Sequence, residues 1–215
     1  MKIKTKSLIQ ITGALLLACL LSAAMRGQTK EAPVKKIYLQ LAGGASSHDG
    51  TVSEFGIQAV LKHNWTATFS YHIMEMDPEN LPADYDPGYF LILPGMYPTV
   101  KMNLFSLTGG KCFQTGRKTW FTTEAGFSVV NGEQMSFTRK AADNGGWYSN
   151  SNYSESTEKK NTVGGMLKAD FNWAFLPYAG LGAGVFANFN SIQSPVGFQV
   201  KLICGWMNNK RKKSG

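Results

Sequence analysis

The strongest constraint on the fold is an alternation of apolar with small or polar residues that runs through the chain with a period of two. It is clearest in the last apolar-rich stretch, Val196–Trp206. One parity carries Val196, Phe198, Val200, Leu202, Cys204 and Trp206, and the other carries Gly197, Gln199, Lys201, Ile203 and Gly205. Successive side chains of a β-strand point to opposite faces, so this stretch is predicted to be a strand with one apolar face.

Seven earlier segments, rich in β-branched and aromatic residues, are also predicted to be strands. They are Lys36–Ala45, Ser53–Lys62, Trp65–Met74, Val100–Cys112, Trp120–Val130, Thr162–Trp173 and Ala179–Phe189. The prediction is therefore an all-β chain of eight strands with no helix between them. The last strand should pair with the first, which would close the sheet and remove its edges.

Two places interrupt this pattern. Near Phe105–Leu107 the phase of the alternation becomes unclear, which we interpret as a β-bulge. Asn131-Gly132 is a typical hairpin signal, but a turn there would make the strand count odd. Glu133–Phe137 is therefore predicted to continue the preceding strand, and the polar stretch Ala141–Lys160 is predicted to be a loop.

The N-terminus has the pattern of a secretory signal peptide. A basic start with Lys2, Lys4 and Lys6 precedes the apolar run Leu8–Leu21, and small residues follow at Ser22-Ala23-Ala24. Cleavage is expected after Ala24, with Gly27 as the second choice. Two alternatives are weaker. The run is short for a transmembrane anchor, and it continues past Cys19, which disfavours a lipoprotein signal.

These boundaries divide the chain into a signal peptide (1–24), a short linker (25–35), the sheet (36–207) and a basic tail (208–215). Part of the formal net charge of +8 lies in the two terminal segments, so no broad basic face for nucleic acid is predicted. Cys112 and Cys204 lie on strands that should not be neighbours, so we expect two free thiols.

Alternation alone does not say whether the apolar face points inward, as in a soluble ligand-binding barrel or β-sandwich, or outward. The other face is made of Gly, Thr, Ser, Gln and Asn with few charges, which suits a crowded lumen better than a solvated surface. Short connections at 63–64, 114–118 and 176–178 also alternate with longer ones, as in outer-membrane barrels. These features favour a transmembrane β-barrel with both termini in the periplasm.

Four tryptophans should form a periplasmic aromatic girdle, because two start their strands and two end theirs, which places all four at the same rim of an up-and-down barrel. They are Trp65, Trp120, Trp173 and Trp206. Trp120 has the opposite parity to the others, but Phe121 beside it has the expected one.

The chain thus resembles the small eight-stranded outer-membrane barrels of the OmpA-domain and OmpX type. The stretch Lys101–Phe137 is also similar to bacterial proteins described as "outer membrane β-barrel domain", and Gly197-x-x-Val200-x-Leu202 is similar to the signal that the barrel-assembly machinery reads. The resemblance covers about residues 36–207. It implies the fold, outer-membrane lipid and lipopolysaccharide as surroundings, and the assembly machinery as a partner during insertion.

The polar parity carries Glu54, Glu124 and Asp170 with Lys62, Lys101, Lys168 and Lys201. Glu124, Lys168, Asp170 and Lys201 should lie at similar depth and form a charge network that fills the lumen, because buried charges must be paired. A narrow pore is the alternative. The scattered histidines and cysteines have no metal-ligand spacing, so no metal or cofactor is predicted.

The leading functional hypothesis is an integral outer-membrane protein without enzymatic activity, which is structural or binds an unknown ligand through its extracellular loops. Phe90, Trp147 and Tyr148 are the possible loop contacts. The alternative is a lipid-modifying enzyme with its site at the upper rim near His48 and His72, which would need a nucleophile and an orienting acid beside them.

Overall fold

The computed structural model describes residues 34–90, 93–94, 96–140, 148–149 and 151–207. The predicted signal peptide, most of the predicted linker and the predicted basic tail lie outside the described residues.

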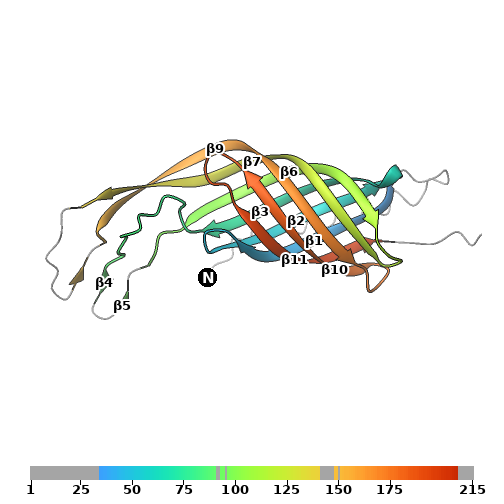
Figure 1. Ribbon diagram of the computed structural model, residues 1–215, viewed down its shortest axis with the longest axis horizontal. Helices are drawn as coiled ribbons and strands as arrows, with labels where there is room; N and C mark the ends of the chain where they lie inside the picture. The colour runs from blue at the N-terminus through green and yellow to red at the C-terminus, as the bar shows by residue number, and fades with distance from the viewer. Residues whose placement is uncertain (1–33, 91–92, 95, 141–147, 150, 208–215) are drawn as a thin grey trace, which may run out of the picture.

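Eight antiparallel strands form a closed up-and-down barrel (Figure 1), which confirms the predicted all-β architecture. Their bounds are β1 Val34–Ser46, β2 Gly50–Leu61, β3 Trp65–Met76, β6 Val100–Gln114, β7 Thr119–Arg139, β9 Tyr153–Trp173, β10 Ala179–Phe189 and β11 Val196–Trp206. The first and last strands pair, with Leu41 opposite Leu202, so the predicted closure is also confirmed.

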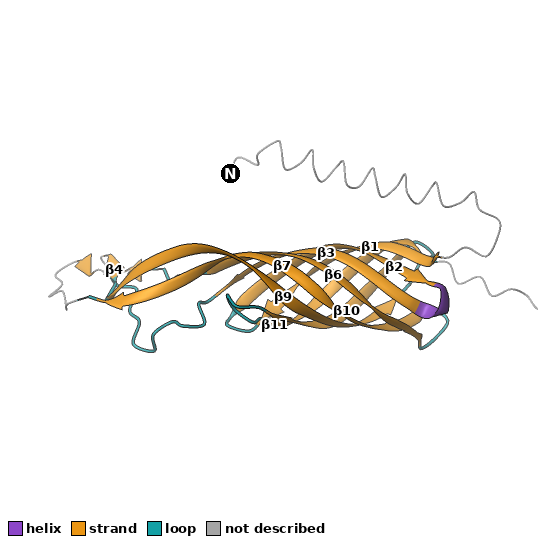
Figure 2. Cartoon of the chain, turned by 90° about the horizontal axis from the view of Figure 1, so that it is seen from above, coloured by secondary structure: helices purple, strands orange, loops and turns teal. Residues whose placement is uncertain are grey.

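The barrel has two unlike ends (Figure 2). We call one the turn end: it carries the 3-10 turn η2 (Lys62–Asn64) and the short connections 115–118 and 174–178. The other is the loop end, with connections 47–49, 77–99, 140–152 and 190–195. At the loop end, β4 (Tyr89–Phe90) pairs with β5 (Leu93–Pro94) and with β8 (Tyr148–Ser149) in a small separate sheet.

The two tightest connections each use two residues with left-handed backbone. His48 and Asp49 have φ of 60° and 48°, and His63 and Asn64 have φ of 56° and 61°. Turns with positive φ at both central residues match the right-handed twist of the strands that they join. His48 and His63 are therefore turn residues.

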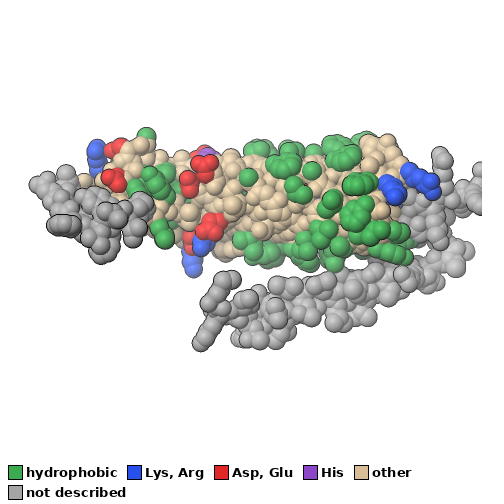
Figure 3. Space-filling model, turned by 90° about the horizontal axis from the view of Figure 1, so that it is seen from below, with side chains coloured by type: hydrophobic (Ala, Val, Ile, Leu, Met, Phe, Trp, Pro, Cys, Tyr) green, Lys and Arg blue, Asp and Glu red, His purple; other side chains and the backbone are tan. Residues whose placement is uncertain are grey.

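The apolar parity points outward along the barrel. Phe198, Val200 and Leu202 are each about half exposed, whereas Gln199 and Lys201 are buried. On the face that Figure 3 shows, hydrophobic side chains gather along the middle of the barrel, and charged ones lie toward its two ends. An outward apolar band between polar ends is the surface of a membrane barrel.

The bulge predicted near Phe105–Leu107 is absent, since the pairing of β6 with both neighbours runs through these residues without a register shift. The alternation is blurred for a different reason. Val100, Met102 and Leu104 point into the lumen and are buried, whereas Phe105 and Leu107 point outward. Lys101 and Asn103 point outward beside the first three, and Ser106 points inward, so the apolar residues change face within β6, which obscures the period.

Strands β7 and β9 extend past the barrel rim as a two-stranded ribbon, paired as far as Arg139 and Tyr153. This confirms that Glu133–Phe137 continues its strand. The prediction of a loop over Ala141–Lys160 is wrong for 153–160, which belong to β9. This part of the ribbon has no buried face, so its strands carry no apolar alternation to reveal them.

Candidate functional site

The middle of the lumen holds a compact cluster of four charged side chains, all almost completely buried. Lys168 Nζ contacts Glu54 Oε1, and Lys201 Nζ lies 2.7 Å from Asp170 Oδ1 and 3.8 Å from Glu54 Oε2. Gln199 also donates to Glu54 Oε2, at 2.6 Å. Two carboxylates and two ammonium groups balance each other, which is the condition for keeping charges inside a barrel.

The sequence placed Glu124 in this network, but the structure gives it other partners. Glu124 accepts hydrogen bonds from Gln58 Nε2 at 2.5 Å, and from Thr68 Oγ1 and Thr108 Oγ1 at 2.8 Å each. Lys168 is its neighbour in the β7–β9 ladder, yet the Lys168 ammonium reaches Glu54 on β2. Strand pairing alone does not identify the partner of a long side chain inside a barrel.

Trp120 faces the lumen and is only 1% exposed, so its placement in the girdle is wrong. Its indole Nε1 donates to the Tyr38 hydroxyl at 3.2 Å, and Lys36 Nζ lies 3.7 Å from its ring centroid. Trp120 points inward because it occupies a lumen-facing position in the alternation of β7. Trp120 therefore helps to fill the lumen near the turn end, together with Tyr38, Val60, Cys112 and Ile203.

The other three girdle tryptophans lie on the outer side. Trp65 is 52% exposed, Trp173 is 46% exposed, and Trp206 is half-buried at the end of β11. The two cysteines among the described residues are free, with Cys112 buried and Cys204 exposed.

The lumen near the loop end is apolar and rich in methionine, which the sequence did not reveal. The cluster that fills it is Val52, Met74, Met76, Val100, Met102, Leu104, Val130, Met166 and Phe186. Lys101, which the sequence placed on the lumen face, instead points outward and pairs with Glu75 at 3.6 Å. An interior filled by side chains is expected at eight strands.

His72 does not reach the rim where an enzyme would need it. It is 0% exposed, its Nε2 lies 3.0 Å from Ser70 Oγ, and its Nδ1 lies 4.0 Å from Glu54 Oε2. Met74 and Met76 follow on the same face of β3, between His72 and the loop end. His48 lies in the exposed turn after β1. The two histidines are therefore not brought together at the rim.

The most elaborate structure at the loop end is an aromatic cluster that fixes segment 77–99 to the ribbon. Tyr85 is its centre and is only 8% exposed. Its ring centroid lies 5.8 Å from that of Tyr97, 5.7 Å from that of Phe137 and 6.1 Å from that of Tyr153. Sequence reasoning missed this cluster, because it joins residues from three separate segments.

Polar contacts surround these rings. Tyr85 donates to Glu155 at 2.5 Å, Tyr153 donates to Asp84 Oδ1 at 2.7 Å, and Arg139 lies 3.2 Å from Asp84 Oδ2. Asn80 donates to the backbone oxygen of Met135 at 2.7 Å. The hydrogen bond from Tyr153 lowers the pKa of the Asp84 carboxyl below its ordinary value, and the charge of Arg139 adds to this. Segment 77–99 is therefore held at several points.

Two of the three loop contacts predicted from sequence lie in the small sheet at the loop end. Phe90 lies in β4 and Tyr148 lies in β8, and the two residues are paired partners in the small sheet. Trp147 lies outside the described residues.

The described residues contain neither a helical membrane span nor a cluster of metal-ligating side chains. No helix among them is both long and apolar enough to cross a membrane. No group of three or more His, Cys, Asp or Glu among them could hold a metal ion.

Neither a protein-family model nor a curated protein sequence matches the chain. The structure is similar to the N-terminal β-barrel domain of Pseudomonas aeruginosa OprF, with a TM-score of 0.50 and 12% identity over 80% of this chain and 98% of that one. It is equally similar to Neisserial surface protein A, with a TM-score of 0.50 and 10% identity over 80% and 96% of the two chains. The chain therefore has the fold of the small eight-stranded outer-membrane β-barrels.

Proposed function

We propose that this chain is an integral outer-membrane protein without enzymatic activity, with both termini in the periplasm, that offers its loop end as a surface for binding. The observation that carries the proposal is the contrast between the two parts of the molecule. The lumen is packed with buried side chains, whereas the loop end holds the β7–β9 ribbon and segment 77–99 in a fixed arrangement through Tyr85.

The fold supports the membrane location, because barrels of this shape are used by bacterial outer-membrane proteins. The outward apolar band suits lipid and lipopolysaccharide as surroundings. The proposed secretory signal and the C-terminal strand suit export followed by insertion through the barrel-assembly machinery.

The proposed orientation can be tested with single cysteines introduced into a background in which Cys112 and Cys204 are serine. Met96→Cys at the loop end should react with a membrane-impermeant maleimide on intact cells, since Met96 is 94% exposed. His63→Cys at the turn end should react only after the outer membrane is permeabilised. Labelling of His63→Cys on intact cells, with Met96→Cys protected, would reverse the orientation.

The binding role can be tested with the protein in nanodiscs against an array of purified glycans and lipopolysaccharides. We expect wild type to retain a ligand that Tyr85→Ala loses, because the loop end depends on that ring. The variant Cys204→Ser, on the outer wall, is the matched control. Equal retention by wild type and Tyr85→Ala of every probe would contradict a role for this surface.

A further inference from the structure

The outer surface of the turn end has an unusual distribution of charge. Five cationic side chains lie there and are exposed or partly exposed: Lys35, Lys62, Lys111, Arg117 and Lys118. No carboxylate shares this outer surface among the described residues, and the carboxylates Glu54, Glu124 and Asp170 are enclosed in the lumen. At the loop end, exposed carboxylates such as Glu75 and Asp84 lie close to cationic side chains.

Lys111 is the cation of this group that the structure places most closely against the aromatic girdle. Its Nζ lies 3.7 Å from the Trp65 ring centroid and donates to the His63 backbone oxygen at 3.4 Å. Trp side chains favour the membrane–water interface, so this ammonium lies at headgroup depth. A lysine ammonium has three donors, which leaves N–H groups for a further acceptor.

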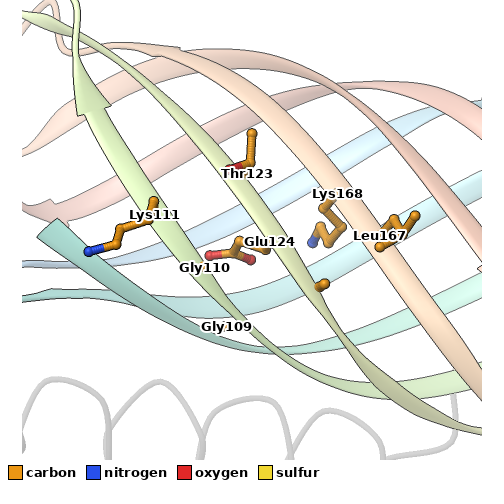
Figure 4. A pocket seen from close by; sticks show the side chains of 8 residues that line it. Gly109, Gly110, Lys111, Thr123, Glu124, Leu167 and Lys168 are labelled. Carbon is orange, nitrogen blue, oxygen red and sulfur yellow. The ribbon is translucent and has the colours of Figure 1, made fainter.

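A cleft of about 410 Å³ adjoins Lys111 on the outer wall, across β6, β7 and β9 (Figure 4). The paired Gly109 and Ala125 form its floor, and Gly110, Glu124 and Lys168, which occupy lumen-facing positions of the same strands, also line it. The Leu107–Phe127 pair lies one row nearer the loop end, and the Lys111–Thr123 pair lies one row nearer the turn end. Because Gly109 and Ala125 are smaller than these neighbours, the floor is recessed in the outer wall, within the apolar band.

In Figure 4, Lys111 and Leu167 lie on opposite sides of the cleft, and the ammonium of Lys111 points away from Leu167. The site therefore combines an apolar floor with a cation at headgroup depth. These two features match the two parts of a phospholipid, its apolar acyl chain and its anionic phosphate. Cations near a membrane surface favour anionic over zwitterionic headgroups.

We infer that this cleft and Lys111 form a binding site for one anionic phospholipid of the leaflet at the turn end. The phosphate contacts the Lys111 ammonium, and an acyl chain lies over the Gly109–Ala125 pair. This inference rests on the membrane placement proposed above.

The test is native mass spectrometry of the purified barrel, released from micelles that contain equal amounts of dioleoylphosphatidylglycerol and dioleoylphosphatidylcholine. Only preparations that show the heat-modifiable migration of a folded barrel are used, so failure of the fold is detected separately. We expect wild type to retain one phosphatidylglycerol in preference to phosphatidylcholine. Equal retention of the two lipids by folded wild type would overturn the inference.

Two variants separate the headgroup from the chain. Lys111→Gln should lower the preference for phosphatidylglycerol about fivefold, which corresponds to one cation near a membrane surface. Ala125→Leu should remove the retained lipid, because the added side chain fills the cleft. Their matched controls are Lys118→Gln, a cation at the same end outside the cleft, and Ala183→Leu, an outward alanine of β10; both should behave as wild type.

Loss of lipid from Lys118→Gln equal to that from Lys111→Gln would mean a general attraction to the basic end, and it would overturn the site. Unchanged retention by folded Ala125→Leu would also overturn it, because the acyl chain would then lie elsewhere.

Discussion

At the scale of single residues, the buried charge cluster makes the clearest prediction about stability. Lys168→Met removes the cation that contacts Glu54 and leaves a buried carboxylate with less compensation. Breaking one side of a buried ion pair costs about 3–5 kcal/mol. The free energy of unfolding of Lys168→Met, measured by urea titration in lipid vesicles, should fall by that amount.

The control is Lys101→Met, which breaks the Lys101–Glu75 pair on the surface. Exposed ion pairs contribute little, so its unfolding should be close to that of wild type. Equal losses in the two variants would show that the lumen cluster is not a stabilising pair.

Two adjacent glycines of β6 give a second residue-scale prediction. A Cβ on Gly110 would lie 1.8 Å from the Thr123 backbone oxygen, whereas one on Gly109 would meet only the Thr66 oxygen at 3.5 Å. Gly110→Ala must therefore push β7 away from β6, and the yield of folded barrel in a refolding assay should drop several-fold. Gly109→Ala should refold like wild type, and a reversal of this order would contradict the packing.

Parity predicted the direction of most side chains from sequence alone, including Gln199 and Lys201 inside the lumen. Parity also predicts that Trp120 points into the lumen. The girdle hypothesis is wrong for this residue because it relies on the position of Trp120 at a strand end and not on its parity. The partner of Lys168 could not be predicted. Glu54 is 114 positions away, and only the closed barrel brings the two side chains into contact.

At the scale of elements, the ribbon and segment 77–99 should separate if their central ring is removed. Tyr85→Ala deletes a nearly buried aromatic side chain that contacts three other rings. Limited proteolysis of the folded protein should then cut within 77–99 about tenfold faster, because the chain opens locally more often. Met96→Ala, at a highly exposed neighbour, should leave the rate unchanged, and equal rates for all three proteins would contradict the cluster.

The attachment of segment 77–99 to the ribbon should also depend on pH, because the Tyr153–Asp84 hydrogen bond contributes to it. The hydrogen bond from Tyr153 gives Asp84 a lower pKa in the folded protein than its ordinary value of 3.8. Its contribution to stability is therefore fully present above that value and is lost as the pH falls through the lower folded pKa. Hydrogen exchange of 77–99 should accelerate as the pH is lowered into this range, after correction for the intrinsic rate. Asp84→Asn should lack this change, and an equal response of the variant would exclude Asp84 as the cause.

The ribbon shows the limit of sequence reasoning about elements. Strands of the barrel have a lipid face and a lumen face, so their alternation is visible over most of their length. In the outer half of β9, residues 154–160 are exposed whichever face they lie on, so their sequence is polar and is typical of a loop. Their strand geometry comes from pairing with β7. Likewise, the apolar upper lumen places the apolar residues of β6 on its inner face at Val100–Leu104 and on its outer face at Phe105 and Leu107, and this change of parity imitates a bulge.

At the scale of the whole molecule, the lumen should not conduct. The methionine-rich cluster near the loop end and the Tyr38–Trp120 cluster near the turn end enclose the charged layer between them. Wild type in planar bilayers should therefore show no conductance steps at protein concentrations where a known porin shows them. Regular steps that disappear when the protein is boiled would contradict a filled barrel.

The central claim is that the chain is a closed membrane barrel, and heat-modifiable gel migration tests it most directly. The protein should be found in the outer-membrane fraction and, without boiling, should migrate faster than after boiling, because a closed barrel stays compact in detergent. After boiling it should migrate near the position expected for a chain of 23.6 kDa less the proposed signal peptide. The same migration with and without boiling, for protein taken from that fraction, would contradict the barrel.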